Sequence, residues 1–121
     1  MAAPDTAASP EVALVLRLGR ALHTHGYPAP LLESSLTKVA ERFGLESQFF
    51  STPTSLFCSF GPIERQQTFL LRVEPGEVNL GRLTQLHRLI GEELERQLGA
   101  EDGLRRLAAI LAAPAPYPAW L

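Results

Sequence analysis

The sequence holds few residues from which covalent or metal chemistry could be built. Its 121 residues include one cysteine, Cys58, which can form neither an internal disulfide nor a zinc site with cysteine partners. A single thiol fits a reducing compartment. Cys58 alternates with the apolar Leu56 and Phe60, so we expect a buried, unreactive thiol.

Long apolar runs and an excess of one charge are also missing. No stretch reaches the roughly 18 uninterrupted apolar residues that a membrane span needs. The opening residues, MAAPDTAASP, have neither the basic nor the apolar part of a secretory signal. Eleven basic residues stand against thirteen acidic ones, a net charge of -2, which leaves no basic footprint for a polyanion. We therefore expect a soluble chain that does not bind nucleic acid.

Cofactor and metal signatures are missing as well. Gly76 and Gly81 have neither the Walker nor the dinucleotide-binding spacing. His23 and His25 would lie about 200° apart on a helix, without a carboxylate at helical spacing beside either. The sequence therefore predicts no metal and no cofactor.

The chain has the length and the 45% hydrophobic content of one globular domain. Residues 1–9 are small and polar without periodicity, and we expect them to form a disordered tail. Residues 10–113 carry the periodic segments of the domain. Residues 114–121 form a proline-rich tail that cannot continue a helix.

Apolar periodicity predicts the elements, and Ser9 and Asn79 are the expected N-caps of the first and third helices. Helical spacing covers residues 10–25 and about 30–43, and β alternation follows in 48–51, 55–60 and 68–73. Helical spacing returns in residues 80–98, ending at Gly99, and in a short fourth helix that carries Leu104, Leu107, Ala108 and Leu111. The order ααβββαα predicts an α+β domain in which a small, mainly antiparallel three-stranded sheet packs against about four helices.

Two of these helices allow more detailed predictions. The first is apolar over much of its circumference, which predicts a central position. On the third, Leu83, Leu86, Ile90 and Leu94 form the core stripe. The neighbouring charges Glu92, Glu93, Glu95 and Arg96 are typical of a solvated helix face.

The sharpest local feature is Thr52-Pro53-Thr54, between the first two strands. Two hydroxyls beside a rigid proline could line a small ligand site, or one could act as a nucleophile if a base lay nearby. In the alternative, structural interpretation, the threonines satisfy backbone groups at a tight turn.

His87 and Glu33 are the candidate partners of these hydroxyls. His87 lies at the edge of the apolar stripe of the third helix, where an imidazole could serve Ser51, Thr52 or Ser55 as a base. The alternative for His87 is a partly buried ring that donates to a carbonyl. Glu33 could be an acid or an anchor, or it could stabilise the positive end of the second helix.

Four separated segments resemble one family. They are LRLGRALHTHGYPAPLLESSL (16–36), FFSTPTSLFCSF (49–60), VNLGRLTQLHRL (78–89) and PAPYPAWL (114–121). Together, and in this order, they are similar to the hydrophilic N-terminal domain of threonine/serine exporters, inner-membrane proteins that continue into many transmembrane helices. The resemblance implies a role in amino-acid efflux and a membrane-spanning domain or subunit as partner.

One departure from the family pattern bears on catalysis. The family domain has been likened to hydrolases, and its members commonly carry a hydroxyl and a guanidinium where this chain has Ala29 and Leu31. Their loss argues against an inherited catalytic role, so we assign no catalytic residue.

The leading hypothesis is therefore an accessory domain of an exporter, acting in regulation, assembly or sensing on the cytoplasmic side of the inner membrane. Thr52, Thr54, Glu33 and His87 are its candidate ligand-binding residues. A homo-oligomer and a small amino-acid ligand are further partners that it admits. The alternative is a small hydrolase-like domain that uses a hydroxyl near residues 51–55 with a His or Glu base. Tyr117 and Trp120 suit a membrane boundary and should then pack loosely.

Overall fold

The computed structural model describes residues 9–74 and 76–114. Its elements, in order, are α1 (Pro10–Thr24), α2 (Ala29–Arg42), β1 (Ser47–Thr52), β2 (Ser55–Phe60), the 3-10 turn η1 (Ile63–Arg65), β3 (Gln67–Arg72), α3 (Leu80–Glu95) and α4 (Ala100–Ala112). The predicted fold class is confirmed. The expectations for residues 1–8 and for Tyr117 and Trp120 lie outside the described residues.

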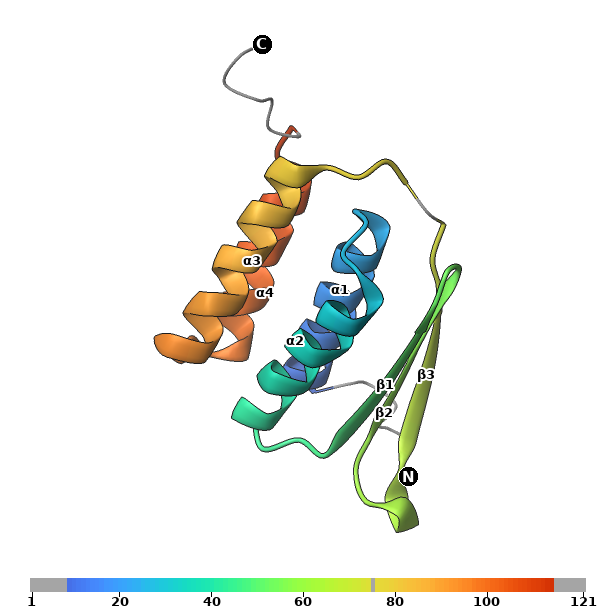
Figure 1. Ribbon diagram of the computed structural model, residues 1–121. Coiled ribbons are helices and arrows are strands. Elements are labelled where there is room, and N and C mark those ends of the chain that lie inside the picture. The colour runs from blue at the N-terminus through green and yellow to red at the C-terminus, as the bar shows by residue number, and fades with distance from the viewer. Residues whose placement is uncertain (1–8, 75, 115–121) are drawn as a thin grey trace.

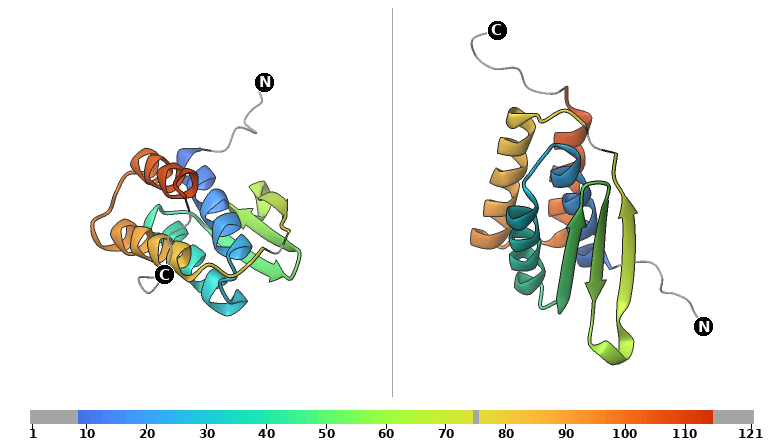
Figure 2. Two further views of the ribbon diagram at one scale, coloured as in Figure 1. Left: turned by 90° about the horizontal axis from the view of Figure 1, so that it is seen from above. Right: turned by 45° about the vertical axis from the view of Figure 1, so that its right-hand side comes forward.

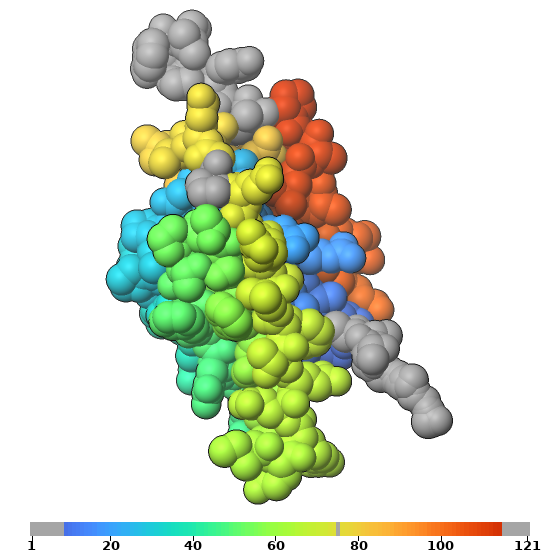
Figure 3. Space-filling view, turned by 90° about the vertical axis from the view of Figure 1, so that its right-hand side faces the viewer, coloured from blue at the N-terminus to red at the C-terminus, as the bar shows by residue number. Residues whose placement is uncertain are grey.

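The elements form three layers (Figure 1). The sheet is one outer layer, α1 and α2 are the middle layer, and α3 and α4 are the other outer layer (Figure 2). Both neighbouring pairs of strands are antiparallel, in the order β1-β2-β3. Among the described residues, no helix covers the sheet face that points away from α1 and α2, as Figure 3 shows from that side. The fold therefore places α1 and α2 between the sheet and the outer helices and leaves one sheet face open.

Helix α1 is central, as its apolar circumference predicted. Leu14, Val15, Leu18 and Leu22 have no exposed surface. Gly19 lets α1 approach its neighbours closely, because a Cβ there would lie 2.8 Å from Leu56 of β2 and 2.9 Å from Leu36 of α2. Because Gly19 has no side chain, β2, α1 and α2 can pack closely at this point.

Capping residues set the helix boundaries. Ser9 accepts a hydrogen bond from the backbone N–H of Val12, and Asn79 accepts one from that of Arg82, so both predicted N-caps are confirmed. Our prediction for the end of the third helix was wrong. Helix α3 stops at Glu95 because Gln97 adopts the left-handed conformation, with φ 55°, that commonly follows a helix. Gly99 instead precedes α4 as its N-cap.

The strands alternate as predicted. Leu56, Cys58 and Phe60 of β2 are buried against the helices, whereas Phe57 points to the open face. Burial raises the pKa of the Cys58 thiol to about 12, which disfavours the reactive thiolate. Pro53 and Thr54 form a two-residue turn between the paired residues Thr52 and Ser55.

A buried ion pair joins the middle layer to the outer helices. Arg42 of α2 donates through Nη2 to Oε1 of Glu93 at 3.3 Å and through Nε to the Glu93 carbonyl at 2.6 Å. The same guanidinium also donates to the carbonyl of Leu98. Glu93 has no exposed surface, so our prediction of a solvated face was wrong at this residue. Its helical position faces α2 and α4, where Arg42 provides a partner for its charge.

The second carboxylate oxygen of Glu93 shapes the contact between α3 and α4. Glu93 Oε2 has no hydrogen-bond partner among the described residues. It lies against Gly103 of α4, where an added Cβ would clash with it. Burial raises the pKa of Glu93 to about 7, although the charges of Arg42 and Arg106 act to lower it.

Substituting alanine for Gly103 should therefore destabilise the domain. The new methyl group would crowd Glu93 Oε2 and lie 2.8 Å from Leu14, a clash that should lower the free energy of unfolding by about 1–3 kcal/mol. Gly91→Ala is the matched control, because that helical glycine has no atom within 4 Å of an added Cβ. Its helix propensity should raise stability by up to about 1 kcal/mol. If both substitutions changed the free energy of urea unfolding equally, the close packing of Gly103 against Glu93 would be contradicted.

Stability should fall as pH rises through the range in which Glu93 titrates. With a folded pKa of about 7 against an ordinary 4.5, the folded state keeps a proton that the unfolded chain has already released. The contribution of Glu93 is thus most favourable below pH 4.5 and is lost progressively up to pH 7, by about 3 kcal/mol. Urea unfolding of the wild type and Glu93→Gln across this range measures the difference. If the stability difference between the two proteins did not vary with pH, the raised pKa of Glu93 would be contradicted.

Candidate functional site

The turn between β1 and β2 brings two hydroxyls together. Thr52 Oγ1 and Ser55 Oγ lie 2.6 Å apart, and the backbone N–H of Thr54 donates to Thr52 Oγ1 at 3.3 Å. The Thr54 carbonyl accepts from the N–H of Val73, which follows β3. The Thr54 side chain is exposed. These bonds match the structural interpretation of the threonine pair, in which a hydroxyl supports a tight turn.

His23 links this turn to α1, a contact that the sequence did not predict. Its Nε2 lies 2.6 Å from the carbonyl oxygen of Thr52. Since a carbonyl only accepts, Nε2 carries the proton, and a neutral ring has its lone pair at Nδ1. His23 shares a side of the helical wheel with the apolar residues of α1, and this was the available signal that it faces the core. We had weighed it only as a metal ligand.

Glu33 links the same strand to α2 through a hydrogen bond. Its Oε2 accepts a hydrogen bond of 2.8 Å from the backbone N–H of Ser51. Because β1 is an edge strand, it has N–H groups that no neighbouring strand can pair, and Glu33 satisfies one of them in partly buried surroundings. We considered Glu33 as an acid, as an anchor, or as a group that stabilises the positive end of α2. It lies beyond the first turn of that helix, and its hydrogen bond to Ser51 holds a strand instead.

His87 lies elsewhere. It is exposed on α3, and the middle layer of α1 and α2 separates that helix from the sheet (Figure 1). Among the described residues no hydrogen bond joins His87 to residues 51–55, and its ring is not the partly buried one that we weighed. The structure thus brings Thr52, Thr54 and Glu33 to one end of the sheet and places His87 on another surface.

A hollow of about 330 Å³ opens beside the anchored turn. Its lining combines the last turn of α1, the loop to α2 and the end of β1: His23, Gly26, Tyr27, Ala29, Ser51, Thr52, Pro53 and Gly76. Helix α2 begins at this hollow with no side-chain cap on its first N–H groups. The partial positive charge of a helix N-terminus favours a carboxylate. The hollow therefore combines an electropositive backbone with a hydroxyl and aromatic surface.

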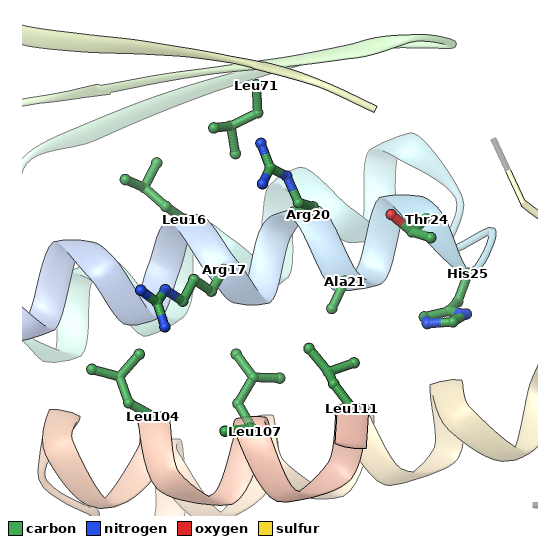
Figure 4. A pocket seen from close by; sticks show the side chains of 11 residues that line it. Leu16, Arg17, Arg20, Ala21, Thr24, His25, Leu71, Leu104, Leu107 and Leu111 are labelled. Atoms are coloured by element: carbon green, nitrogen blue, oxygen red, sulfur yellow. The ribbon is translucent and has the colours of Figure 1, made fainter. Parts of the chain in front are cut away.

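A second hollow has a different character. It is a groove of about 590 Å³ over α1, bounded by α4 on one side and β3 on the other (Figure 4). Its walls are leucines, among them Leu71 and Leu107, and Arg17 and Arg20 of α1 line it as well. His25 lies at one end, where burial and then the charge of Arg82 lower its pKa. This groove offers more apolar surface than the hollow at the turn.

Loss of the Glu33 anchor should weaken the domain measurably. Glu33→Ala leaves the Ser51 N–H without its acceptor, which should lower the free energy of unfolding by about 1–3 kcal/mol. Glu33→Gln retains an acceptor oxygen and should lose less. The control is Glu41→Ala, an exposed residue of the same helix, expected to change stability by no more than about 0.5 kcal/mol. Equal losses at both positions in urea unfolding would refute the anchor.

Comparison with known proteins gives the family. The family model for threonine/serine exporters (ThrE) matches residues 13–121. An uncharacterized protein of Schizosaccharomyces pombe is 29% identical over 108 residues, which are 88% of this chain and 14% of that protein. Pheromone-regulated membrane protein 10 of Yarrowia lipolytica is 31% identical over 109 residues, 88% of this chain and 9% of the relative.

The protein of the same name in Saccharomyces cerevisiae is 31% identical over 109 residues, again 88% of this chain and 14% of the relative. The chain thus spans a small fraction of the length of the relatives that it matches. No solved structure matches it. No helix in the described ranges is long and apolar enough to cross a bilayer. The family match runs through nearly all of the folded domain and includes the segments that carry the resemblance, so this chain belongs to the threonine/serine exporter family.

Proposed function

We propose that this chain is the N-terminal accessory domain of an exporter-type membrane protein and that it binds a small polar amino acid beside the β1–β2 turn. The proposal places it on the cytoplasmic side of the membrane, where the exported solute accumulates. Family membership and the much greater length of the relatives, some of them named membrane proteins, support an accessory role. Sensing the solute is the accessory role that the hollow suits best.

The main support for amino-acid binding is the hollow at the start of α2. Its volume, about 330 Å³, is near the lower end for ligand pockets, which suits a small solute. A ligand carboxylate would be favoured at the uncapped N-terminus of α2. Ser51 provides a hydroxyl for the polar side chain of threonine or serine.

The anchors of the turn keep this hollow in shape. His23 holds the Thr52 carbonyl from α1, and Glu33 holds the Ser51 N–H from α2. Thr54 lies exposed at the turn, where its hydroxyl could reach a ligand at the rim. A preformed site loses less freedom on binding than a mobile loop would. We therefore include Thr52, Thr54 and Glu33 in the proposed site, and leave out His87.

Titration with threonine or serine should shift the backbone amide resonances of the non-proline residues in 26–31 and 51–54, whereas leucine should have a weaker effect. Ser51→Ala removes one hydroxyl from the hollow and should weaken threonine binding roughly five- to tenfold, the effect of about one hydrogen bond. Ser34→Ala, an exposed hydroxyl of α2, is the matched control and should bind as the wild type does. Two-dimensional ¹H–¹⁵N NMR measures both.

The same pair of variants tests the role in cells. Introduced into the gene that encodes this protein, Ser51→Ala should change how threonine efflux depends on internal threonine, and Ser34→Ala should not. Absence of amide shifts at millimolar threonine would refute the ligand site. Binding without any change in efflux would refute its role in export.

A further inference from the structure

The open face of the sheet has an unusual composition. The register of the strands arranges its side chains in three rows, Gln48–Ser59–Thr68, Phe50–Phe57–Leu70 and Thr52–Ser55–Arg72. The middle row is apolar and the outer rows are polar. Arg72 is the one charged residue of the nine. A sheet face turned to water normally carries polar and charged side chains, so the apolar middle row of this face is unusual.

The middle row is accessible. Phe50, Phe57 and Leu70 are 62%, 39% and 54% exposed. The rings of Phe50 and Phe57 lie side by side, 6.2 Å between centroids, and cross-strand pairing brings Leu70 against Phe57. A contiguous apolar patch rimmed by polar residues is the usual mark of an interaction surface.

We propose that two copies of this chain associate through these open sheet faces, with the Phe57 row of one packed on the Phe57 row of the other. The pattern itself identifies the partner. Because an apolar row lies between two polar ones, a twofold rotation about Phe57 places apolar on apolar and polar on polar, as a symmetric interface requires. Arg72 is the one charged group on this face with which a charged partner surface could form an ion pair.

The single charge agrees with this arrangement. When two sheets pack face to face with their strands roughly aligned, a twofold axis through Phe57 runs either along the strands or across them. The register then places Arg72 opposite Thr52 of the second copy in the first case and opposite Thr68 in the second. Neither case brings the two Arg72 side chains together, so the aligned dimer contains no like-charge contact.

The size of the face sets the expected strength. Three strands about 4.8 Å apart and about six residues long present roughly 300 Å². A stable dimer buries about 800 Å² on each partner, so we expect a weak, concentration-dependent dimer. The proposed dimer does not depend on amino-acid binding at the end of the sheet, although Thr52 belongs to both surfaces.

Sedimentation velocity from about ten micromolar to about one millimolar protein tests the proposal, since a weak dimer dissociates within this range. The wild-type mass should rise toward the dimer. Phe57→Lys places two like charges on the twofold axis and should weaken association at least tenfold. Ile63→Lys is the matched control, because Ile63 is 84% exposed in η1 and lies off the face. It should associate as the wild type does.

Two further variants keep the test decisive. Leu70→Lys should also weaken association, and it replaces Phe57→Lys if circular dichroism shows that variant to be unfolded. Mixing Phe57→Lys with Phe57→Glu should restore a dimer, because opposite charges then meet on the axis. A wild type that stays monomeric, association that survives both lysine variants, or a mixture that stays monomeric would each overturn the proposal.

Discussion

Burial of α1 on several sides is the constraint on which the other layers depend. The helix presents leucine and valine around its circumference, so the sheet, α2 and the outer helices must all cover it. Gly19 brings β2 and α2 close to the axis of α1 at one point. The sheet then has its inner face committed to α1 and α2, and its outer face stays open. The three-layer order therefore follows from the need to bury the apolar surface of one helix, α1.

Polar groups then decide how the outer helices are positioned on this core. Glu93 inserts its carboxylate between α2 and α4, and Arg42 fixes both its side chain and the backbone around it. Gly103 is needed where the second oxygen lies. Such a pair costs desolvation energy, and burial keeps the pKa of Glu93 near the physiological range. The same contact that positions α3 and α4 therefore makes their packing sensitive to pH.

The β1–β2 turn is held by the same type of long-range polar contact. His23 and Glu33 come from different helices, and each satisfies a backbone group of β1. The hollow opens at this hydrogen-bonded end of the sheet, which is where we propose ligand binding. The open sheet face, by contrast, has the exposed apolar residues Phe50, Phe57 and Leu70. One sheet thus presents both the end at which we propose solute binding and the open face at which we propose that a second copy packs.

The sequence by itself determined the element order, the central position of α1 and the buried face of β2, because these depend on local periodicity and on the caps at Ser9 and Asn79. It also showed the family. The tertiary structure alone decided that Glu93 is buried, that His23 faces Thr52 and that His87 does not. Each of these outcomes depends on residues far apart in sequence, 51 positions for Arg42 and Glu93 and 29 for His23 and Thr52. A helical wheel gives the direction of a side chain, and only the packing of layers supplies the partner that makes burial of its charge or polarity tolerable.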